Sequence, residues 1–594
     1  MKFLRVTLFA VGLLLVIGAF PRAGTLQFWY YAMGALLCFI VTVKLKPTPS
    51  EDKGPDVIHA WGPRLAKSVT DARAAIAPAI ARAGADFQIA PGLSLDSDAA
   101  SRDFAIFGAT GSGKSTVLWW FIQQILESSS RALINDTKGE LVVLLKGVLM
   151  ALNRPLDLII EVGLRSTAWA WAVGVDVFSK SPSVLIERAQ ALADRIVEAP
   201  AQAAENAIFY AAARIITRAG IIELCARHGA AWGFRELGEA LSLPYEELRE
   251  LLKDHSGALR ALGAGDRYTS SVIATLAPAA DRCTRLGALF ADCKGFSFSA
   301  WMRAKTAAQF AVLVADPAMD DLSRWVAGAI TAVVATAMLD ADVRREARES
   351  GRATTWLVLD EFASLGRLEQ IQKIASLGRS LGVRLVLALQ SYSQLEQTYG
   401  EHGARSVMAC CSNAVLLQAA AGAANDQHFC AELIGKRTVK RRTISTSSTE
   451  SKDRQQSEIS TSKSTSENWH YAEEYLVPPP SFRSAIGVTP NGVTGFVLTP
   501  AATVLNPATG QCDPLVVLCR WPFAPRVEEV EAQLGGLEAG TPNLLSSRSP
   551  AAPAPLSHLN GTARLAEVSK PESFDAEMKA VLESIEQLAG VHYA

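Results

Sequence analysis

One short stretch constrains this chain more than any other, residues 104–126, which read FAIFGATGSGKSTVLWWFIQQIL. An apolar strand pattern leads into a glycine-rich turn, and a helical pattern follows at once. The turn fits GxxxxGK[ST] in full, a loop whose backbone N–H groups converge on phosphate oxygens at the positive end of a helix. The sequence therefore predicts a nucleotide-binding P-loop in an α/β fold with a parallel sheet.

The residues of this loop have distinct expected roles. Lys114 is expected to neutralise the β- and γ-phosphates of ATP, and Ser115 to bind Mg²⁺. The predicted nucleotide contacts of this segment are Gly108, Ala109, Thr110, Gly111, Ser112, Gly113, Lys114, Ser115 and Thr116. The alternative, a chance glycine-rich turn, leaves the flanking strand and helix patterns unexplained.

A second motif supplies carboxylates. The apolar run TTWLVL at residues 354–359 ends in Asp360 and Glu361. We expect its strand to neighbour the P-loop strand, with Asp360 holding Mg²⁺ through water and Glu361 polarising the attacking water as general base. The acid pair favours hydrolysis over simple nucleotide binding. The alternative is a helix N-cap with a solvated acid.

Three further polar features lie where the sheet is expected to end. Gln390 closes the strand VRLVLALQ, where it could sense the γ-phosphate or cap the next turn. Arg379, on the polar connector before that strand, is expected either to reach a neighbouring subunit's nucleotide as an arginine finger or to be a solvated cation. The segment NDTKGEL at residues 135–141 follows another strand and sits at the edge where open α/β sheets bind ligands, or forms a turn.

The N-terminus carries two apolar runs, at residues 6–20 and 28–43, with basic residues at positions 2, 5, 44 and 46 outside the pair. These runs predict a transmembrane hairpin with both ends, and everything after it, in the cytoplasm. The alternative for the first run is a cleaved signal peptide.

The rest of the chain changes pattern several times. Strand signals vanish between about residues 184 and 290, where apolar residues take helical spacing. Residues 436–470 have too few apolar side chains to bury a core. The expected divisions are a transmembrane hairpin at 1–46, a linker with a short helix at 47–85, the first part of an α/β nucleotide-binding domain at 86–183, an all-α domain at 184–300, the second part of the nucleotide-binding domain at 301–435, a disordered Ser/Thr-rich loop at 436–470, a short β-rich return to that domain at 471–525, and a flexible tail with an acidic amphipathic helix at 526–594.

The formal net charge of −1 excludes a protein that coats nucleic acid by bulk charge, so any DNA contact must come from local patches. The end of the expected all-α domain and the residues directly after it offer one cluster. Its basic residues could contact phosphates along a pore or form a solvated charged face. They are Arg260, Arg267, Arg282, Arg285, Arg303 and Lys305.

Taken together, GATGSGKS, DTKGE, WLVLDEFASLGRL and GRSLGVRLVLALQSYSQLEQTYG resemble the type IV secretion coupling proteins, the TraD/TraG-like conjugation ATPases. The resemblance spans roughly residues 1–435, with weaker support to about 525. It departs at Thr137, where the family has proline, and in the short connection between the two apolar runs. The residues that match the family's nucleotide site are Lys114, Ser115, Asp360, Glu361 and Gln390, with Arg379 in the place of its trans-acting arginine.

The resemblance implies a homohexamer in the bacterial inner membrane, with a RecA-like motor, an all-α domain at the cytoplasmic entrance and a central channel for DNA. The expected function is an ATP hydrolase that uses Mg²⁺ and ATP to move single- or double-stranded DNA without sequence preference. It would link a relaxase-bound strand to the components of a type IV secretion channel. The alternatives are a coupling ATPase for protein effectors only, an FtsK-type DNA-segregation translocase, and an assembly motor that acts without DNA.

Overall fold

The computed structural model describes residues 57–128, 130–165, 168–198, 206–263, 267–304, 308–349, 354–452 and 459–538. The chain divides into two compact units, one comprising 60–438 and 473–593, the other built around 439–472 and the residues before 60. The expected transmembrane hairpin at 1–46 and the acidic amphipathic helix of the tail lie outside the described residues. Among the helices that are described, none combines the length and the hydropathy needed to span a bilayer.

The core of the larger unit is a mixed sheet of twelve strands, counted over the described residues. Its main path runs β18-β19-β17-β13-β5-β12-β11-β6-β10-β7, with β16 beside β17 and β2 beside β19. From β13 to β7 all neighbours are parallel, and β17, β18 and β19 add an antiparallel end. The strands are β2 (Arg64–Leu65), β5 (Phe104–Phe107), β6 (Arg131–Asp136), β7 (Ile159–Gly163), β10 (Phe310–Val314), β11 (Thr355–Leu359), β12 (Val383–Leu389), β13 (Asn413–Leu416), β16 (Gly487–Thr489), β17 (Gly492–Leu498), β18 (Thr503–Leu505) and β19 (Cys512–Trp521).

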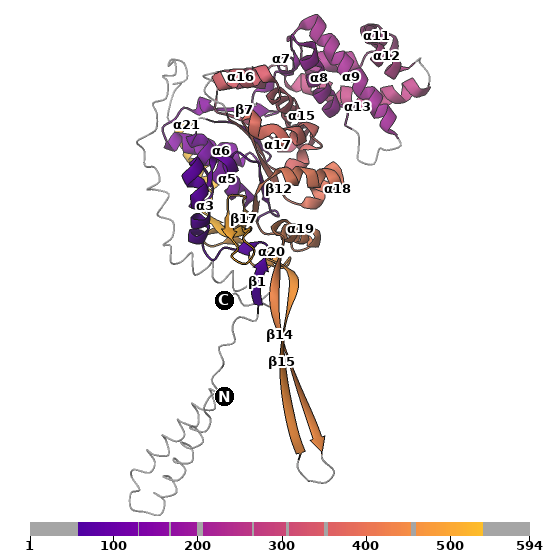
Figure 1. Cartoon of the computed structure of the whole chain (residues 1–594). Helices are drawn as coiled ribbons and strands as arrows, with labels where there is room; N and C mark the ends of the chain where they lie inside the picture. Colours follow the sequence, from indigo (N-terminus) through magenta and orange to yellow (C-terminus); the bar gives the residue numbers. More distant parts are fainter. Residues whose placement is uncertain are drawn as a thin grey trace, which may run out of the picture. The chain divides into compact units, whose positions relative to one another are not determined.

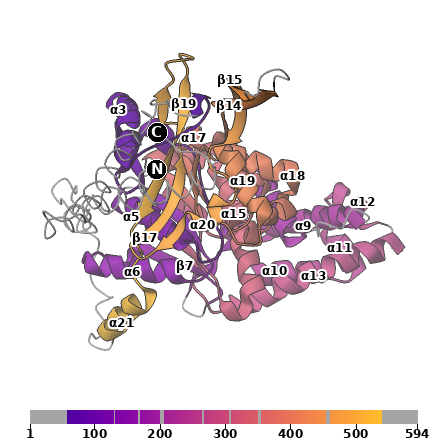
Figure 2. The ribbon, with the colours of Figure 1, turned by 90° about the horizontal axis from the view of Figure 1, so that it is seen from below.

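Helices cover both faces of this sheet, which is why its central strands are continuous apolar runs. Figures 1 and 2 both show one group of helices on one side of the sheet and a second group on the other. The first group is α3 (Val69–Ala83), α5 (Lys114–Glu127), α6 (Glu140–Ala151) and α21 (Val527–Glu538). The second is α15 (Asp320–Met338), α17 (Glu369–Leu381), α18 (Tyr392–Cys410) and α19 (Ala424–Ile434).

Short elements connect these layers. They are β3 (Ala85–Ala90), β4 (Leu93–Asp96), α4 (Ser97–Ala100), η2 (Leu156–Leu158), β8 (Ala170–Trp171), α7 (Val173–Val177), β9 (Gly295–Phe296), α14 (Phe298–Arg303), η4 (Pro317–Met319), α16 (Ala341–Glu349), η5 (Phe362–Leu365) and α20 (Ser481–Ser484). The two-residue strands β8 and β9 pair in parallel, and β9 lies inside the all-α domain expected at 184–300, close to its end.

The described residues between β8 and β9 form six helices after α7, which we call the helical group and which extend from the sheet in Figure 1. They are α8 (Pro182–Ile196), α9 (Ala207–His228), α10 (Phe234–Leu241), α11 (Tyr245–Leu251), α12 (Ser256–Leu262) and α13 (Arg267–Leu289). The group meets the sheet domain along α15. There Trp325 of α15 contacts Phe234 of α10, with ring centroids 6.1 Å apart, and its indole N–H donates to the Arg195 carbonyl of α8 at 2.8 Å.

The expected disordered loop at 436–470 is corrected by the structure. Residues in this stretch form β14 (Lys436–Lys452) and β15 (Ile459–Tyr475), which join β1 (Val57–Trp61) in a three-stranded sheet of order β1-β14-β15. A low apolar content means that a segment cannot bury a core, but it does not prevent strand pairing. Threonine, with its β-branched side chain, favours extended backbone, and strand pairing satisfies the N–H and C=O groups without any core.

Two other divisions also differ in part from the sequence-based expectation. The expected linker contains its short helix, α3, but also the strands β1 and β2, and α3 buries Val69, Ala72 and Ile76. The expected flexible tail begins with α21, where Val530 is buried against α6 so closely that a Cβ on Gly147 would lie 2.3 Å from it. In both places a narrow apolar stripe of a small helix is buried although the local composition is polar or alanine-rich.

Candidate nucleotide-binding and hydrolysis site

The predicted P-loop, residues 108–113, connects β5 to α5. Gly111 and Gly113 have φ angles of 77° and 96°, which glycine adopts without steric cost. A Cβ on Gly113 would lie 2.4 Å from Val493 of β17, so the close approach of this strand also requires glycine. The Ala109 N–H donates to the Gln418 carbonyl at 2.8 Å. The loop is therefore shaped by its own glycines and held by residues far along the chain.

Lys114 lies at the first position of α5 and is 8% exposed. Its ammonium group donates to the carbonyls of Gly108 at 2.6 Å and Ala109 at 3.0 Å, which holds it over the loop. Burial lowers the pKa of Lys114 to about 8, and the carboxylates of Asp360 and Glu361 oppose this shift. A bound polyphosphate would add negative charge beside the ammonium group and favour its protonated form.

The strand order brings the distant motifs together at one edge. Strand β12 lies between β5 and β11, so the expected direct pairing of the P-loop strand with the acid-bearing strand is wrong. Leu389 of β12 pairs with Phe107 of β5, and Leu359 of β11 pairs with Leu387 of β12. The intervening strand therefore ends between the P-loop and the acid pair, which is where Gln390 follows it.

Asp360 is 5% exposed and accepts hydrogen bonds from the Glu361 N–H at 3.0 Å and the Thr137 hydroxyl at 3.4 Å. Burial raises the pKa of Asp360, Glu361 raises it further, and Lys138 and Lys114 oppose the rise. The Asn135 amide donates to the Asp360 carbonyl at 2.9 Å. Within the NDTKGEL segment, Thr137 thus contacts the Asp360 carboxylate and Asn135 holds the Asp360 backbone.

Glu361 has a φ of 51°, in the left-handed region that residues other than glycine rarely adopt. Such a backbone costs about 1–3 kcal/mol and persists where the surrounding structure holds it in place. The Gln390 amide donates to a Glu361 carboxylate oxygen, and the Thr110 hydroxyl of the P-loop donates to the Gln390 carbonyl oxygen at 3.1 Å. Thr110, Gln390 and Glu361 therefore form a continuous hydrogen-bonded relay from the phosphate loop to the predicted base.

The other predicted residues have mixed outcomes. Ser115 and Thr116 lie in the first turn of α5, beside Lys114. Arg379 lies in helix α17 and not on a connector, and its side chain is outside what the structure describes.

Asp136 accepts the N–H groups of Gly139 and Val142, both at 2.9 Å, so its own role is turn chemistry. Burial raises its pKa to about 6.

Sequence reasoning did not single out Asn135, Thr137, Gln418 and Val493 as supports of the site. Asn135 and Thr137 lie in the NDTKGEL segment, which the sequence analysis singles out. Gln418 and Val493 belong to no motif, because they reach the site only through the pairing of β13 and β17 in the sheet.

The donor set at this edge fits Mg²⁺. A protein binds that ion through one or two carboxylates, with substrate phosphates and water supplying the remaining oxygens. Asp360 offers a carboxylate and Ser115 a hydroxyl, and among the ion pairs of the described residues none includes Asp360.

These features define a class of protein: an α/β fold with the phosphate loop, paired acids and polar strand-end residue of a P-loop NTPase. Residues 88–479 match the family described as the type IV secretion-system coupling protein DNA-binding domain. This match covers more than half of the chain, and the chain belongs to the type IV secretion-system coupling protein family. The resemblance found in the sequence motifs is confirmed.

Solved structures show the same fold. The unbound bacterial conjugative coupling protein TrwB is 19% identical, with a TM-score of 0.58 over 79% of this chain and 95% of that one. TrwB in complex with ADP and Mg²⁺ is 18% identical with the same coverage and TM-score. TrwB bound to the non-hydrolysable ATP analogue ADPNP is 19% identical, with a TM-score of 0.57 over 79% and 96%. Comparison with curated protein sequences gives no match.

Proposed function

We propose that this chain is an ATP-hydrolysing motor that transfers DNA, linking a relaxase-bound strand to a type IV secretion channel. The observation that carries the proposal is the relay Thr110–Gln390–Glu361 in a member of the coupling protein family. A site that only bound nucleotide would have no need to connect its phosphate loop to a carboxylate on another strand. The fold shared with TrwB, whose structures hold ADP with Mg²⁺ and ADPNP, supports a nucleotide at this edge.

In this mechanism each residue acts on a defined part of the substrate. Lys114 neutralises charge on the β- and γ-phosphates, and Glu361 polarises the attacking water. Ser115 and Asp360 would hold Mg²⁺, which neutralises the charge that develops on the phosphate oxygens. Gln390 contacts both the P-loop and Glu361, so a change in the P-loop on loss of the γ-phosphate would reach Glu361 through Gln390.

The wider assembly is part of the same proposal. The RecA-like motor would work as a homohexamer, with Arg379 of α17 reaching the nucleotide of a neighbouring subunit. The apolar runs at 6–20 and 28–43 would anchor it in the bacterial inner membrane, with the body in the cytoplasm. The family assignment and the helical group beside the motor support these roles.

The test is movement of DNA by the full-length protein in lipid nanodiscs. A duplex carrying a short third strand releases that strand when a motor passes, so release can be followed by fluorescence. We expect release that needs ATP and Mg²⁺ and is absent with ADPNP. ATP hydrolysis without DNA binding or strand release would overturn the proposal and favour a coupling ATPase for protein effectors. Release that depends on one DNA sequence would instead favour a segregation translocase.

A further inference from the structure

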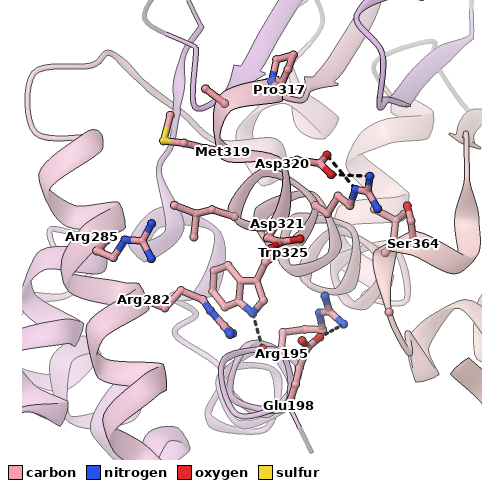
Figure 3. Close-up of a pocket in the computed structure, with 15 residues that line it drawn as sticks. Arg195, Glu198, Arg282, Arg285, Pro317, Met319, Asp320, Asp321, Trp325 and Ser364 are labelled. Atoms are coloured by element: carbon pink, nitrogen blue, oxygen red, sulfur yellow. Dashed lines mark hydrogen bonds and ion pairs between the residues drawn. The ribbon is translucent and has the colours of Figure 1, made fainter. Parts of the chain in front are cut away.

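A cavity of about 870 Å³ lies where the helical group meets the segment that follows Glu361. Its lining comes from the end of α8, from α13, from the start of α15 and from η5, and Figure 3 shows Arg195, Arg282 and Ser364 around it. Of the residues assigned to the nucleotide site, none lines this cavity. The two places share one element, because η5 begins at Phe362, directly after Glu361.

Arg195 of α8 joins the helical group to η5. The residue is 4% exposed and its guanidinium is paired with Glu198. A Cβ on Gly328 of α15 would lie 2.3 Å from one terminal nitrogen of Arg195, and a Cβ on Gly366 would lie 2.7 Å from the other. The guanidinium therefore fills the space between α15 and the residue that ends η5. A Cβ on Gly328 would also lie 2.6 Å from the Leu365 carbonyl oxygen, so α15, η5 and the Arg195 guanidinium meet at this point.

Helix α18 also holds this segment. Phe362 stacks on Tyr399 with ring centroids 5.5 Å apart, and the Tyr399 hydroxyl accepts the Leu368 N–H at 3.0 Å. The Ser364 N–H donates to the Glu361 carbonyl at 2.8 Å. The segment that follows Glu361 therefore contacts Tyr399 at Phe362 and Leu368, and Arg195 at Gly366. A strained backbone such as that of Glu361 persists where the surrounding structure holds it in place.

Arg195 is connected through Trp325 of α15 to α13, another helix of the helical group. Trp325 donates its indole N–H to the Arg195 carbonyl at 2.8 Å, and the Arg282 guanidinium of α13 lies 5.0 Å from the centre of the Trp325 ring. Among the ion pairs of the described residues, Arg282 and Arg285 appear in none, so both are available to an anionic polymer at this surface. A displacement of α13 would move Arg282 against Trp325, and Trp325 would in turn move the Arg195 backbone.

We propose that Arg195 is a positioning residue: through it the helical group sets the placement of the segment that carries Glu361, and so the rate of ATP hydrolysis. The inference rests on the proposed function for its last step, in which DNA at the helical group changes turnover. The placement of Glu361 by Arg195 does not depend on that step. It applies to the basal reaction as well.

The experiment measures kcat and KM for ATP, ADPNP affinity and melting temperature on full-length variants, with and without DNA. In Arg195→Met we expect basal kcat to fall about tenfold or more, with KM and ADPNP affinity within twofold of wild type, because only the base is misplaced. Arg195→Lys keeps the pair with Glu198 and should recover part of the rate. If Arg195→Met does not fold, Glu198→Gln is the substitute variant. Glu198 is more exposed than Arg195, and the loss of its charge should also lower kcat.

The matched control is Arg188→Met. Arg188 is also on α8, is 2% exposed and is paired with Asp340 at 3.1 Å, but it contacts Asp176 and Phe178 and not η5. We expect Arg188→Met to lower the melting temperature as much as Arg195→Met while leaving kcat within twofold.

Equal kcat values for wild type, Arg195→Met and Glu198→Gln would overturn the inference, as would an equal loss of kcat in Arg188→Met. A fall in basal kcat in Arg195→Met, with a wild type that ignores DNA, would keep Arg195 as a positioning residue and reject the proposed DNA motor.

Discussion

The edge of the sheet and the helical group contribute to the same reaction by different means. At the edge, the functional side chains follow strand ends, and the strand order β5-β12-β11 brings them within hydrogen-bond distance. In the helical group, Arg195 lies near the end of the amphipathic helix α8 and acts through its packing against Gly328 and Gly366. The first kind of role depends on chemistry at a fixed position, the second on packing between elements.

This contrast predicts that a change at the edge abolishes the chemical step while the remaining contacts persist. Glu361→Gln preserves shape and can still accept the hydrogen bond from Gln390. It should lower kcat by about 10²–10⁴-fold, because a general base is lost, while ADPNP affinity stays within twofold. Steady-state turnover and fluorescent nucleotide binding measure the two quantities.

An exposed glutamate a short way after Glu361 in the sequence provides the control for this result. Glu369 begins α17, is exposed and pairs with Arg367 at 3.4 Å. Glu369→Gln should leave kcat unchanged. If Glu361→Gln kept the wild-type rate, Glu361 would not be the base and the contrast between the two regions would fail.

A smaller effect is expected in the pH dependence of nucleotide binding. The pKa of Lys114 is lowered to about 8 by burial, so the free protein loses this positive charge as the pH rises through 8. Bound polyphosphate favours the protonated form. ATP affinity should therefore fall as the pH rises above 8, by up to about tenfold per unit, with proton uptake on binding. Calorimetry in buffers of different ionisation enthalpy measures this uptake.

Lys138 provides the matched test, because its charge lowers the pKa of Lys114. In Lys138→Met the fall in affinity should begin at a higher pH than in wild type. A pH profile that is flat from 7 to 10 would show that the Lys114 ammonium group does not respond to its surroundings in this way.

At the edge of the sheet, the residues that could be predicted from the sequence are those whose role depends only on a short local motif. The P-loop and the acids after β11 follow from short motifs, because each motif needs only the turn it forms. The Gln390 contact to Thr110 depends on β12 lying between β5 and β11, and no spacing along the chain encodes that order. The supports Gln418 and Val493 were missed for the same reason.

The helical group was predictable as helices from the period of its apolar residues, but the role of Arg195 was not. In the sequence it is one cation among several on a helix, and only the approach of Gly328 and Gly366 distinguishes it. The paired strands β14 and β15 were missed because a low apolar content excludes a core, yet does not exclude strands whose hydrogen bonds are satisfied by each other.

The central claim is that ATP hydrolysis at the sheet edge is coupled to DNA. The most direct measurement is the ATP turnover of the full-length protein with no DNA, with single-stranded DNA and with double-stranded DNA, at constant salt. The account predicts turnover that rises with DNA and saturates, for strands of unrelated sequence, and that stays at background in Glu361→Gln. Turnover that is substantial but the same with and without DNA would contradict it.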